Sequence, residues 1–468
     1  MKAKLVSLVV AVVALAAPAQ ALASGGSGGA QAALQGSTTD QTALGASVSS
    51  QNAVNANVPV SIAGANVNAG PSSATQAASS TATTNVANTA NTTQNQSQNQ
   101  TLGSSGCQAG CGGPGGFQAG IQDAQTQQYA VGASKSDQNA VNANVPVSVA
   151  GGDVNSGPSS ASQTANSTAT TDVSNDAKTH QDQSQNQNIS GSSCLAGCGG
   201  PGAYQAGAQS AGTNQVAVGT SQSDQNAVNA NVPVSIAGGD VNSGPSSATQ
   251  TANSTATTDV SNDAKTHQDQ SQNQNISGSS CLAGCGGAGG FQLGVQKADT
   301  EQAALGVSYS NQNAVNGNAP VAIAGGDVNS GPSSASQTAN STATTDVSND
   351  AKTHQDQWQN QNIGGGSCGC DSAQRKPTAG CSVGCGGSGG SQLAGQFADT
   401  GQWAAGFAVS KQNAVNSNSP HSTAGYNVYG GPSDASQAAA SNGTTGVGND
   451  AGTHQNQWQA SPSVMPVK

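Results

Sequence analysis

The chain has 468 residues and a formal net charge of −11, and only 7% of its residues are charged and 3% are aromatic. So few large side chains exclude the usual core of Leu, Ile and Phe, and the chain must be disordered or gain order from repetition and hydrogen bonding. The acidic balance and the lack of a basic patch exclude nucleic acid and anionic lipid as expected partners.

Residues 1–23 have the layout of a secretory signal peptide. Lys2 and Lys4 precede an apolar run at 5–17 that is short for a membrane span, and small residues suited to cleavage follow it. A retained N-terminal anchor is the alternative. No second apolar stretch of membrane length follows. We therefore expect a mature chain that starts at Ser24, leaves the membrane after cleavage, and is secreted to the extracellular space or the cell surface.

The rest of the chain is built from one long repeat. The motif Gln-Asn-Ala-Val-Asn recurs five times, at spacings of 87, 87, 87 and 100 residues. Five copies of one pattern indicate a single array rather than five functions. The last copy is degenerate, which is typical of a capping repeat or of drift at an unselected end. We interpret residues 24–116, 117–203 and 204–290 as units one to three, 291–390 as unit four with a 13-residue insertion, and 391–468 as the capping unit five with its tail.

The first arm of each unit, from Gln118 to about Ala150 in unit two, alternates between two kinds of side chain. Period two with β-branched residues predicts a strand. Pro146, which has an equivalent in every unit, suits a sheet edge, a bend or the start of a strand. One parity is small or amide (Ala130, Gly132, Ser134, Ser136, Gln138, Ala140, Asn142, Asn144), and the other is larger (Tyr129, Val131, Val141, Val145, Val147, Val149).

The second arm, 159–189 in unit two, follows a turn predicted at 151–158. Its small and amide residues are spaced by four throughout. On a helix such a series drifts by about 40° per step, whereas on a strand every fourth residue faces the same side. We predict β structure, with a helical second arm as the alternative. The series is Ala161, Ala165, Ala169, Val173, Ala177, Gln181, Gln185 and Ile189.

These patterns predict an all-β fold. An arm of about thirty residues exceeds the usual 3–10 residues of a strand, so each arm is expected to turn several times. Stacked strands with inward Gln and Asn would form amide ladders that replace the missing apolar core. The predicted architecture is a repetitive β-solenoid or stacked cross-β array of five ~87-residue units, with Gly-rich loops and ends that need not be ordered.

Ten cysteines, mostly in C-x3-C pairs, occupy the glycine-rich segments between units. An even number in an exported chain predicts disulfides, either within a pair or between adjacent units. Zinc is the rival, but no His lies beside the pairs, and the C-x2-C motif of thioredoxin-like enzymes is absent. The disulfide candidates are Cys107, Cys111, Cys194, Cys198, Cys281, Cys285, Cys368, Cys370, Cys381 and Cys385.

Other polar motifs give weaker signals. His180 and Asp182, repeated in the next two units, could chelate a metal, but no third ligand is evident and a solvated polar column is the alternative. Residues 151–155 resemble a calcium-binding β-roll turn, yet the motif occurs once per unit, so Asp153 and Asn155 are better explained as turn residues. We expect no metal and no cofactor. Three tryptophans mark either a binding face or packing: Trp358, Trp403 and Trp458.

Residues 57–68 of unit one read Asn-Val-Pro-Val-Ser-Ile-Ala-Gly-Ala-Asn-Val-Asn, and 144–155 of unit two are nearly the same. This segment resembles the core of chaplins, small secreted proteins that coat aerial surfaces of filamentous bacteria as amyloid-like films. The regular Gln and Asn columns resemble curlin-type fibre subunits. The chaplin-like segment covers about a dozen residues per unit. Both resemblances imply a self-assembling surface protein.

No catalytic constellation stands out from the repeat, and an enzyme needs a unique site, so we predict a non-enzymatic protein. The expected function is a secreted structural repeat protein that forms or decorates an extracellular surface layer, coat or fibre by β-strand self-assembly. Self-association is the expected partnership, with a cell-surface polymer as a second candidate partner. The alternatives are an extracellular binding module or adhesin stalk built as a soluble monomeric β-solenoid, and a disordered matrix filler.

Overall fold

The computed structural model describes residues 28–103, 115–190, 202–277, 289–364 and 389–460. Within these ranges the chain forms strands and no helix, so none of this part has a helix long enough to cross a membrane. The all-β prediction is confirmed, and the alternative of a helical second arm is wrong. The predicted signal peptide, the cysteine segments and the tail lie outside the described residues.

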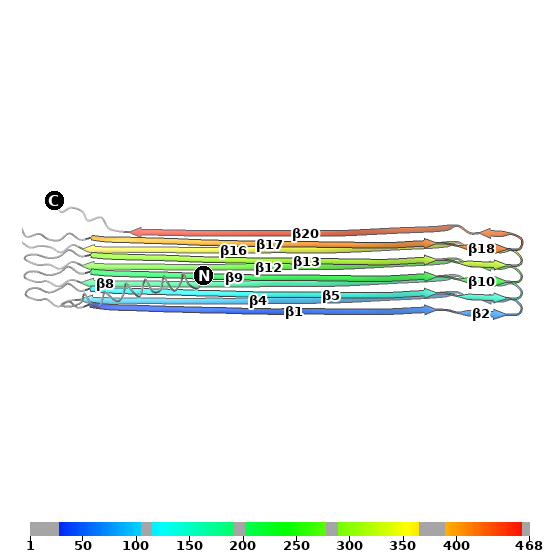
Figure 1. The fold of residues 1–468 in the computed structure, drawn as a ribbon, viewed down its shortest axis with the longest axis horizontal. Helices are drawn as coiled ribbons and strands as arrows, with labels where there is room; N and C mark the ends of the chain where they lie inside the picture. Colours follow the sequence, from blue (N-terminus) through cyan, green and yellow to red (C-terminus); the bar gives the residue numbers. More distant parts are fainter. Residues whose placement is uncertain (1–27, 104–114, 191–201, 278–288, 365–388, 461–468) are drawn as a thin grey trace, which may run out of the picture.

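Each unit folds as one rung, in which two long strands lie face to face and two short strands connect them at one end (Figure 1). The long strands belong to different sheets and contact each other through their side chains. Unit two consists of β5 (Gly115–Asn144), β6 (Val147–Ala150), β7 (Val154–Ser156) and β8 (Ser159–Ser190).

The other four rungs repeat this order of long, short, short and long strands. Their bounds are β1 (Gly28–Asn57), β2 (Val60–Ala63), β3 (Val67–Ala69) and β4 (Ser72–Gly103); β9 (Gly202–Asn231), β10 (Val234–Ala237), β11 (Val241–Ser243) and β12 (Ser246–Ser277); β13 (Gly289–Asn318), β14 (Val321–Ala324), β15 (Val328–Ser330) and β16 (Ser333–Gly364); and β17 (Gly389–Asn418), β18 (His421–Ala424), β19 (Val428–Gly430) and β20 (Ser433–Ala460).

The rungs stack in sequence order, and each strand pairs in parallel with its copy in the next rung. In the described ranges this gives four sheets of five strands. Every residue pairs with its equivalent 87 positions later, as Gln51 does with Gln138, and the final step is 100 positions, as from Gln312 to Gln412. The stacked cross-β array of ~87-residue repeats is therefore confirmed, with equal residues forming columns along the stack.

The expectation that each arm turns several times is wrong. Each first arm consists of one strand of 30 residues and, after the bend at the proline, a short strand of 4 residues, and each second arm in the first four rungs is a single strand of 32 residues. Strands in globular proteins end where a small core ends. Here each strand instead pairs in register with its own copy along its whole length, so nothing in the packing limits it to a few residues.

The interior lies between the two long-strand sheets, and every second side chain points into it. In β8 every odd position from Ser159 to Ile189 is buried, including the whole period-four series. In β5 the small and amide parity is the buried one, so the prediction of inward Gln and Asn is confirmed. Because these side chains are small or hydrogen-bonded, the two sheets pack closely without a large apolar core.

Glycine on one sheet makes room for valine on the other. A Cβ placed on Gly132 would lie 2.6 Å from Val173 Cγ2 and 2.8 Å from Thr171 Cγ2. Gly219 meets the equivalent Thr258 and Val260 side chains at similar distances. Neither β-branched neighbour can swing away at χ1 without losing its own packing, so this inward column requires glycine.

The closed end of each rung uses proline and glycine where the chain bends. Pro146 separates β5 from β6, as a residue without an N–H suits a bend. A Cβ on Gly151 would lie 2.4 Å from the carbonyl oxygen of Gly64 in the rung below. Asp153 accepts the backbone N–H of Asp240 on its carboxylate at 2.9 Å. The chain reverses direction over 151–158 as predicted, but residues 154–156 in this range form the short strand β7, and Asp153 acts as a turn residue before it.

Candidate functional site

Inward glutamines link each rung both to the rung below and to the opposite sheet. Gln128 donates from Nε2 to Oε1 of Gln41 at 2.9 Å and to the backbone oxygen of Asp176 at 2.9 Å. Gln215 repeats both bonds, to Gln128 and to Asp263. Each such bond contributes roughly 1 kcal/mol, and chains of them reinforce one another. Seen along the stack, these glutamine ladders donate from the upper rung to the lower.

Three asparagine columns form ladders of the opposite direction. Asn142 donates to Oδ1 of Asn229 in the rung above at 2.9 Å. Asn88 likewise donates upward to Asn175, at 3.1 Å, and the same bond continues in each rung to Asn449. The two kinds of inward amide therefore give the interior of the stack a defined polarity, with glutamine donating down and asparagine donating up.

A serine chain crosses between the sheets in every described rung. Ser136 donates to Ser80 Oγ at 2.9 Å, Ser167 to Ser136 at 3.0 Å and Ser223 to Ser167 at 2.9 Å. The donors alternate between the two sheets, so the chain climbs the stack in half steps. From Ser80 to Ser310 each hydroxyl accepts one bond from another hydroxyl and donates one, which satisfies these buried groups and ties the sheets together.

The half steps arise because the two sheets are staggered along the stack. β4 contacts both β1 and β5, so it lies at a height between them, and β20 extends beyond β17 at the other end (Figure 1). The consequence is visible in one column of valines: Val86 of β4 is 5% exposed and Val347 is fully buried, but Val447 of β20 is 51% exposed. The unit-five end therefore has an uncovered inner face.

The amide ladders stop at the two ends of the described stack. Gln402 donates to Gln302 at 2.8 Å and to the backbone oxygen of Asp450 at 2.8 Å, and no described residue donates to its Oε1. At the other end, Gln41 donates to the backbone oxygen of Thr89 at 2.7 Å, which uses one of its two amide hydrogens. The unit-five end offers glutamine acceptors and the unit-one end offers glutamine donors.

The outer face of the β4–β8–β12–β16–β20 sheet is polar and carries ladders of charge. Asp172, Asp259 and Asp346 stack in one column, and burial, followed by repulsion from the other two carboxylates, raises the pKa of Asp259. Further along the same face of β12, Asp263 and Lys265 lie in neighbouring columns and pair at 2.7 Å. This bond raises the pKa of Lys265. Like charges stacked at strand spacing repel, so these ladders oppose close stacking.

Three aspartate columns end in neutral residues at both ends of the stack. Two of them lie on this sheet and span units two to four, with Asn or Gly at the equivalent positions in units one and five, whereas the Asp176 column runs from Thr89 to Asp450 and keeps its charge in unit five. The same holds for the turn column of Asp153. The terminal pairs are Asn85 and Gly446 for the Asp172 column, Asn95 and Asn456 for the Asp182 column, and Asn66 and Asn427 for the Asp153 column.

The histidines form a solvated polar column on this face. His180, His267, His354 and His454 stack with ring centroids 4.8 to 4.9 Å apart. His180 lies 3.1 Å from Asp182 on its own strand, and both are partly exposed. Among the described residues no group of three His, Cys, Asp or Glu side chains gathers as metal ligands.

A groove of about 700 Å³ runs beside the histidine column. Trp358 and Trp458 stack there with centroids 5.4 Å apart, next to Asp269 and Asp356. The same column holds the small Ser184 and Ser271 in the rungs below, which leaves the groove open. Packing of tryptophans is thus observed as ring stacking on the surface, outside the interior. Trp403 lies exposed on the opposite outer face.

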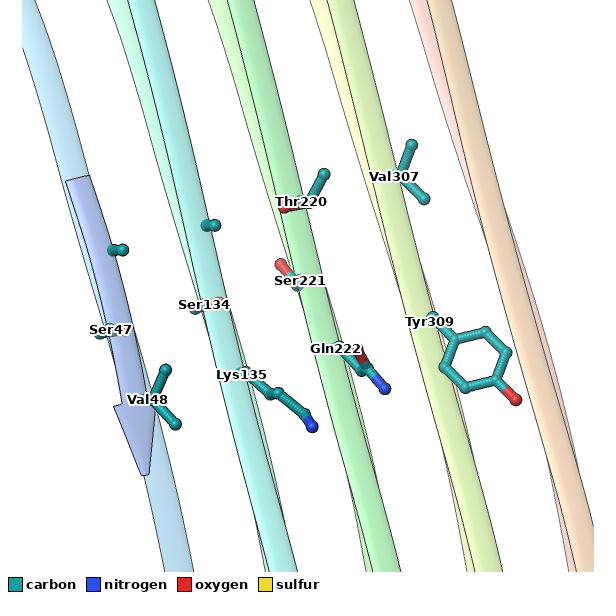
Figure 2. Close-up of a pocket in the computed structure, with 11 residues that line it drawn as sticks. Ser47, Val48, Ser134, Lys135, Thr220, Ser221, Gln222, Val307 and Tyr309 are labelled. Atoms are coloured by element: carbon teal, nitrogen blue, oxygen red, sulfur yellow. The ribbon is translucent and has the colours of Figure 1, made fainter. Parts of the chain in front are cut away.

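The outer face of the β1–β5–β9–β13–β17 sheet is more apolar and differs from rung to rung. Its larger parity includes Tyr129, Val131 and Val141, which are all partly exposed. A groove of about 260 Å³ lies on this face. Figure 2 shows the column of Val48, Lys135, Gln222 and Tyr309, which are among the residues that line it. Apolar side chains on an open face mark a surface suited to contacts with other molecules.

The ten cysteines predicted to form disulfides all lie outside the described residues. The chaplin-like segment 57–68 forms the closed end of the first rung, with β2 and β3. The open ends of the stack were not predicted as sites, because the stagger between the sheets and the direction of the ladders leave no trace in composition or spacing. Comparisons of the chain with protein-family models, with curated proteins and with solved structures found no match.

Proposed function

We propose that this chain is a secreted structural repeat protein that forms or decorates an extracellular surface layer, coat or fibre by β-strand self-assembly. The observation that carries the proposal is the uncovered inner face of β20, where Val447 is half exposed beside amides that have lost their upper partners. Inside the chain, the same face of β4, β8, β12 and β16 is covered by the next rung.

The end strands also lack the features that keep a sheet edge unpaired. Proteins that remain monomeric protect such edges with inward charges, prolines or very short strands. The inward positions of β1, β17 and β20 carry neither charge nor proline, and each strand has 28 or 30 residues. An edge of this length with stacked amides is a template for a further strand.

The proposed role is non-enzymatic, since the interior side chains are copied from rung to rung and serve stacking. The resemblances to chaplins and to curlin-type subunits point to the same class of role. Export rests on the predicted signal peptide at 1–23. In a bacterial host that secretes the full chain, the extracellular protein is expected to begin at Ser24, which N-terminal sequencing checks.

The first test is assembly of the purified mature chain, from Ser24 onward, under oxidising and reducing conditions. We expect thioflavin-positive fibres or sheets in the electron microscope with a β-rich circular dichroism spectrum. Loss of assembly on reduction would place the cysteines in its mechanism. A chain that stays a soluble β-rich monomer at high concentration would overturn the proposal.

That outcome would favour the second candidate, an extracellular binding module. The observation behind it is the groove beside Trp358, where an open ring face meets the carboxylates of Asp269 and Asp356. Aromatic faces with neighbouring hydrogen-bonding groups bind flat, polar ligands, and a cell-surface polymer is the partner that this reading would require.

A further inference from the structure

The two ends of the stack are different and complementary. We infer that copies of this chain add head to tail, with unit one of the incoming copy on unit five of the growing end, in the register that the rungs already have. This inference rests on the proposed self-assembly and adds its polarity and its joint. Head-to-tail interfaces generate filaments when their geometry does not close a ring, and copies added along the straight axis of this stack do not close one (Figure 1).

The hydrogen-bond groups at the two ends match in both ladder types. Gln402 presents an accepting Oε1, and Gln41 of the incoming copy presents an unused amide hydrogen. Asn449 accepts from Asn349 and has its Nδ2 free of any described acceptor, while Asn88 at the other end donates upward and keeps its Oδ1 open. Both of these ladders would therefore continue through the joint with their own direction.

The stagger supplies the matching shape. β20 extends beyond β17, and β1 extends beyond β4 at the opposite end (Figure 1). The incoming β1 would lie on β17 and cover β20, as β5 lies on β1 and covers β4 within the chain. Val447 would then become buried like Val86, which is 5% exposed.

A copy added upside down would not match. Turning the copy places glutamine acceptors against glutamine acceptors. It also sets β17 beside a strand whose inward residues differ, so that no column continues with its own kind. By contrast, in the head-to-tail joint the inward residues of unit one repeat those of unit five almost completely. The differences are Ser37 against Ala398, Ser47 against Ala408, and Ala82 against Gly443.

In the head-to-tail stack, repulsion between like charges would be limited to short runs of aspartates, because neutral residues meet at each joint. At the joint the Asp182 column would read Asn456 against Asn95, so two neutral rungs separate each block of three aspartates. Where unit five keeps a charge, as at Asp450, the incoming position is the neutral Thr89. Asp40 is the charged residue within 28–103, and it would meet Gly401.

Two single substitutions block one end each. Gln402→Lys keeps a donor toward Gln302 but places a charge with no acceptor at the unit-five end. Gln35→Glu still accepts from Gln122, its partner at 3.0 Å, but sets a carboxylate against the glutamine oxygen of the next copy. The controls are outward positions where an added Cβ meets nothing within 4 Å: Gly448→Lys at the unit-five end, which would face the neutral Ala87, and Gly36→Glu at the unit-one end.

Analytical ultracentrifugation with electron microscopy reads out the result. We expect each blocked variant alone to remain monomeric and folded by circular dichroism, and both controls to form filaments like the unsubstituted chain. Mixed in equal amounts, the two blocked variants should form a 1:1 dimer and stop, since only one joint per pair is intact.

Other outcomes distinguish a failure of the head-to-tail polarity from a failure of self-assembly. Homodimers of each blocked variant alone, with no new species on mixing, would overturn head-to-tail addition in favour of joints between like ends. If both blocked variants form filaments, the claim that chains join through the ends of the stack is wrong. If the unsubstituted chain and both controls stay monomeric, the proposed self-assembly itself fails, and the polarity fails with it.

Discussion

One strand, β12, separates the interior of the stack from its outer surface residue by residue. Its inward positions are identical to those of β8 and β16, whereas its charged outward positions are replaced by neutral residues in unit one and, except at Asp450, in unit five. An inward side chain must fit its copy above and below and the opposite sheet at once. An outward side chain faces solvent and is not constrained by an opposite sheet. Stacking therefore fixes the interior, and the surface is free to carry charge and to vary.

The largest difference between the two faces is expected when a lysine is placed at one of two neighbouring positions, one inward and one outward. Val260 is fully buried against Gly219, and Ser261 is its half-buried outward neighbour. We expect Val260→Lys to destabilise the fold by more than about 3 kcal/mol, since it buries an unpaired ammonium. Ser261→Lys should stay within about 0.5 kcal/mol. Chemical denaturation below the assembly concentration measures both, and equal losses would refute the assigned faces.

A smaller effect is expected from one methyl group at two glycines of β9. A Cβ on Gly219 would lie 2.7 Å from Thr258 Cγ2, whereas on the outward Gly212 the nearest atom is 3.9 Å away. Gly219→Ala should lower stability by about 1–3 kcal/mol through overpacking. Gly212→Ala should be neutral or raise it by up to about 1 kcal/mol. In thermal unfolding, adding Val260→Ala should recover part of the Gly219→Ala loss; no recovery would argue against that contact.

The smallest effect concerns surface charge. Because the pKa of Asp259 is raised above 3.8, the folded chain binds this proton more readily than the unfolded chain, so ionisation destabilises the fold. Asp259→Asn should add a few tenths of a kcal/mol, up to about 1 kcal/mol, at neutral pH. The gain should shrink as pH falls through the raised pKa and vanish below about 3.8. Melting temperatures against pH, with Thr257→Asn as control, check this; a gain independent of pH would contradict it.

Much of the fold follows from sequence because the interior obeys a simple period. The series from Ala161 to Ile189 could face one side only on a strand, and the structure buries all of it. The repeat spacing gave the rung-to-rung step, and Pro146 marked the bend. These signals are local or periodic, and both survive in a single sequence.

The rest depends on how copies meet in space. The length of the strands was wrongly predicted because the usual limit reflects small cores, which an in-register stack does not have. The candidate site, at β20 and β1, arises from the half-step stagger between sheets. The direction of each ladder depends on how its amide groups are oriented in the stack. None of these is encoded in spacing or composition, so a correct fold class did not reveal the ends.

Both ends of the described chain, Gly28 and Ala460, lie on the side of the rungs away from the turn (Figure 1). Each rung is held only by its neighbours, so a tensile load between the two ends would peel rungs from the outside inward, one after another. Each 87-residue rung freed in this way would lengthen the chain by about 300 Å. Under tension the molecule would therefore extend in steps, one rung at a time, while its inner rungs stay folded.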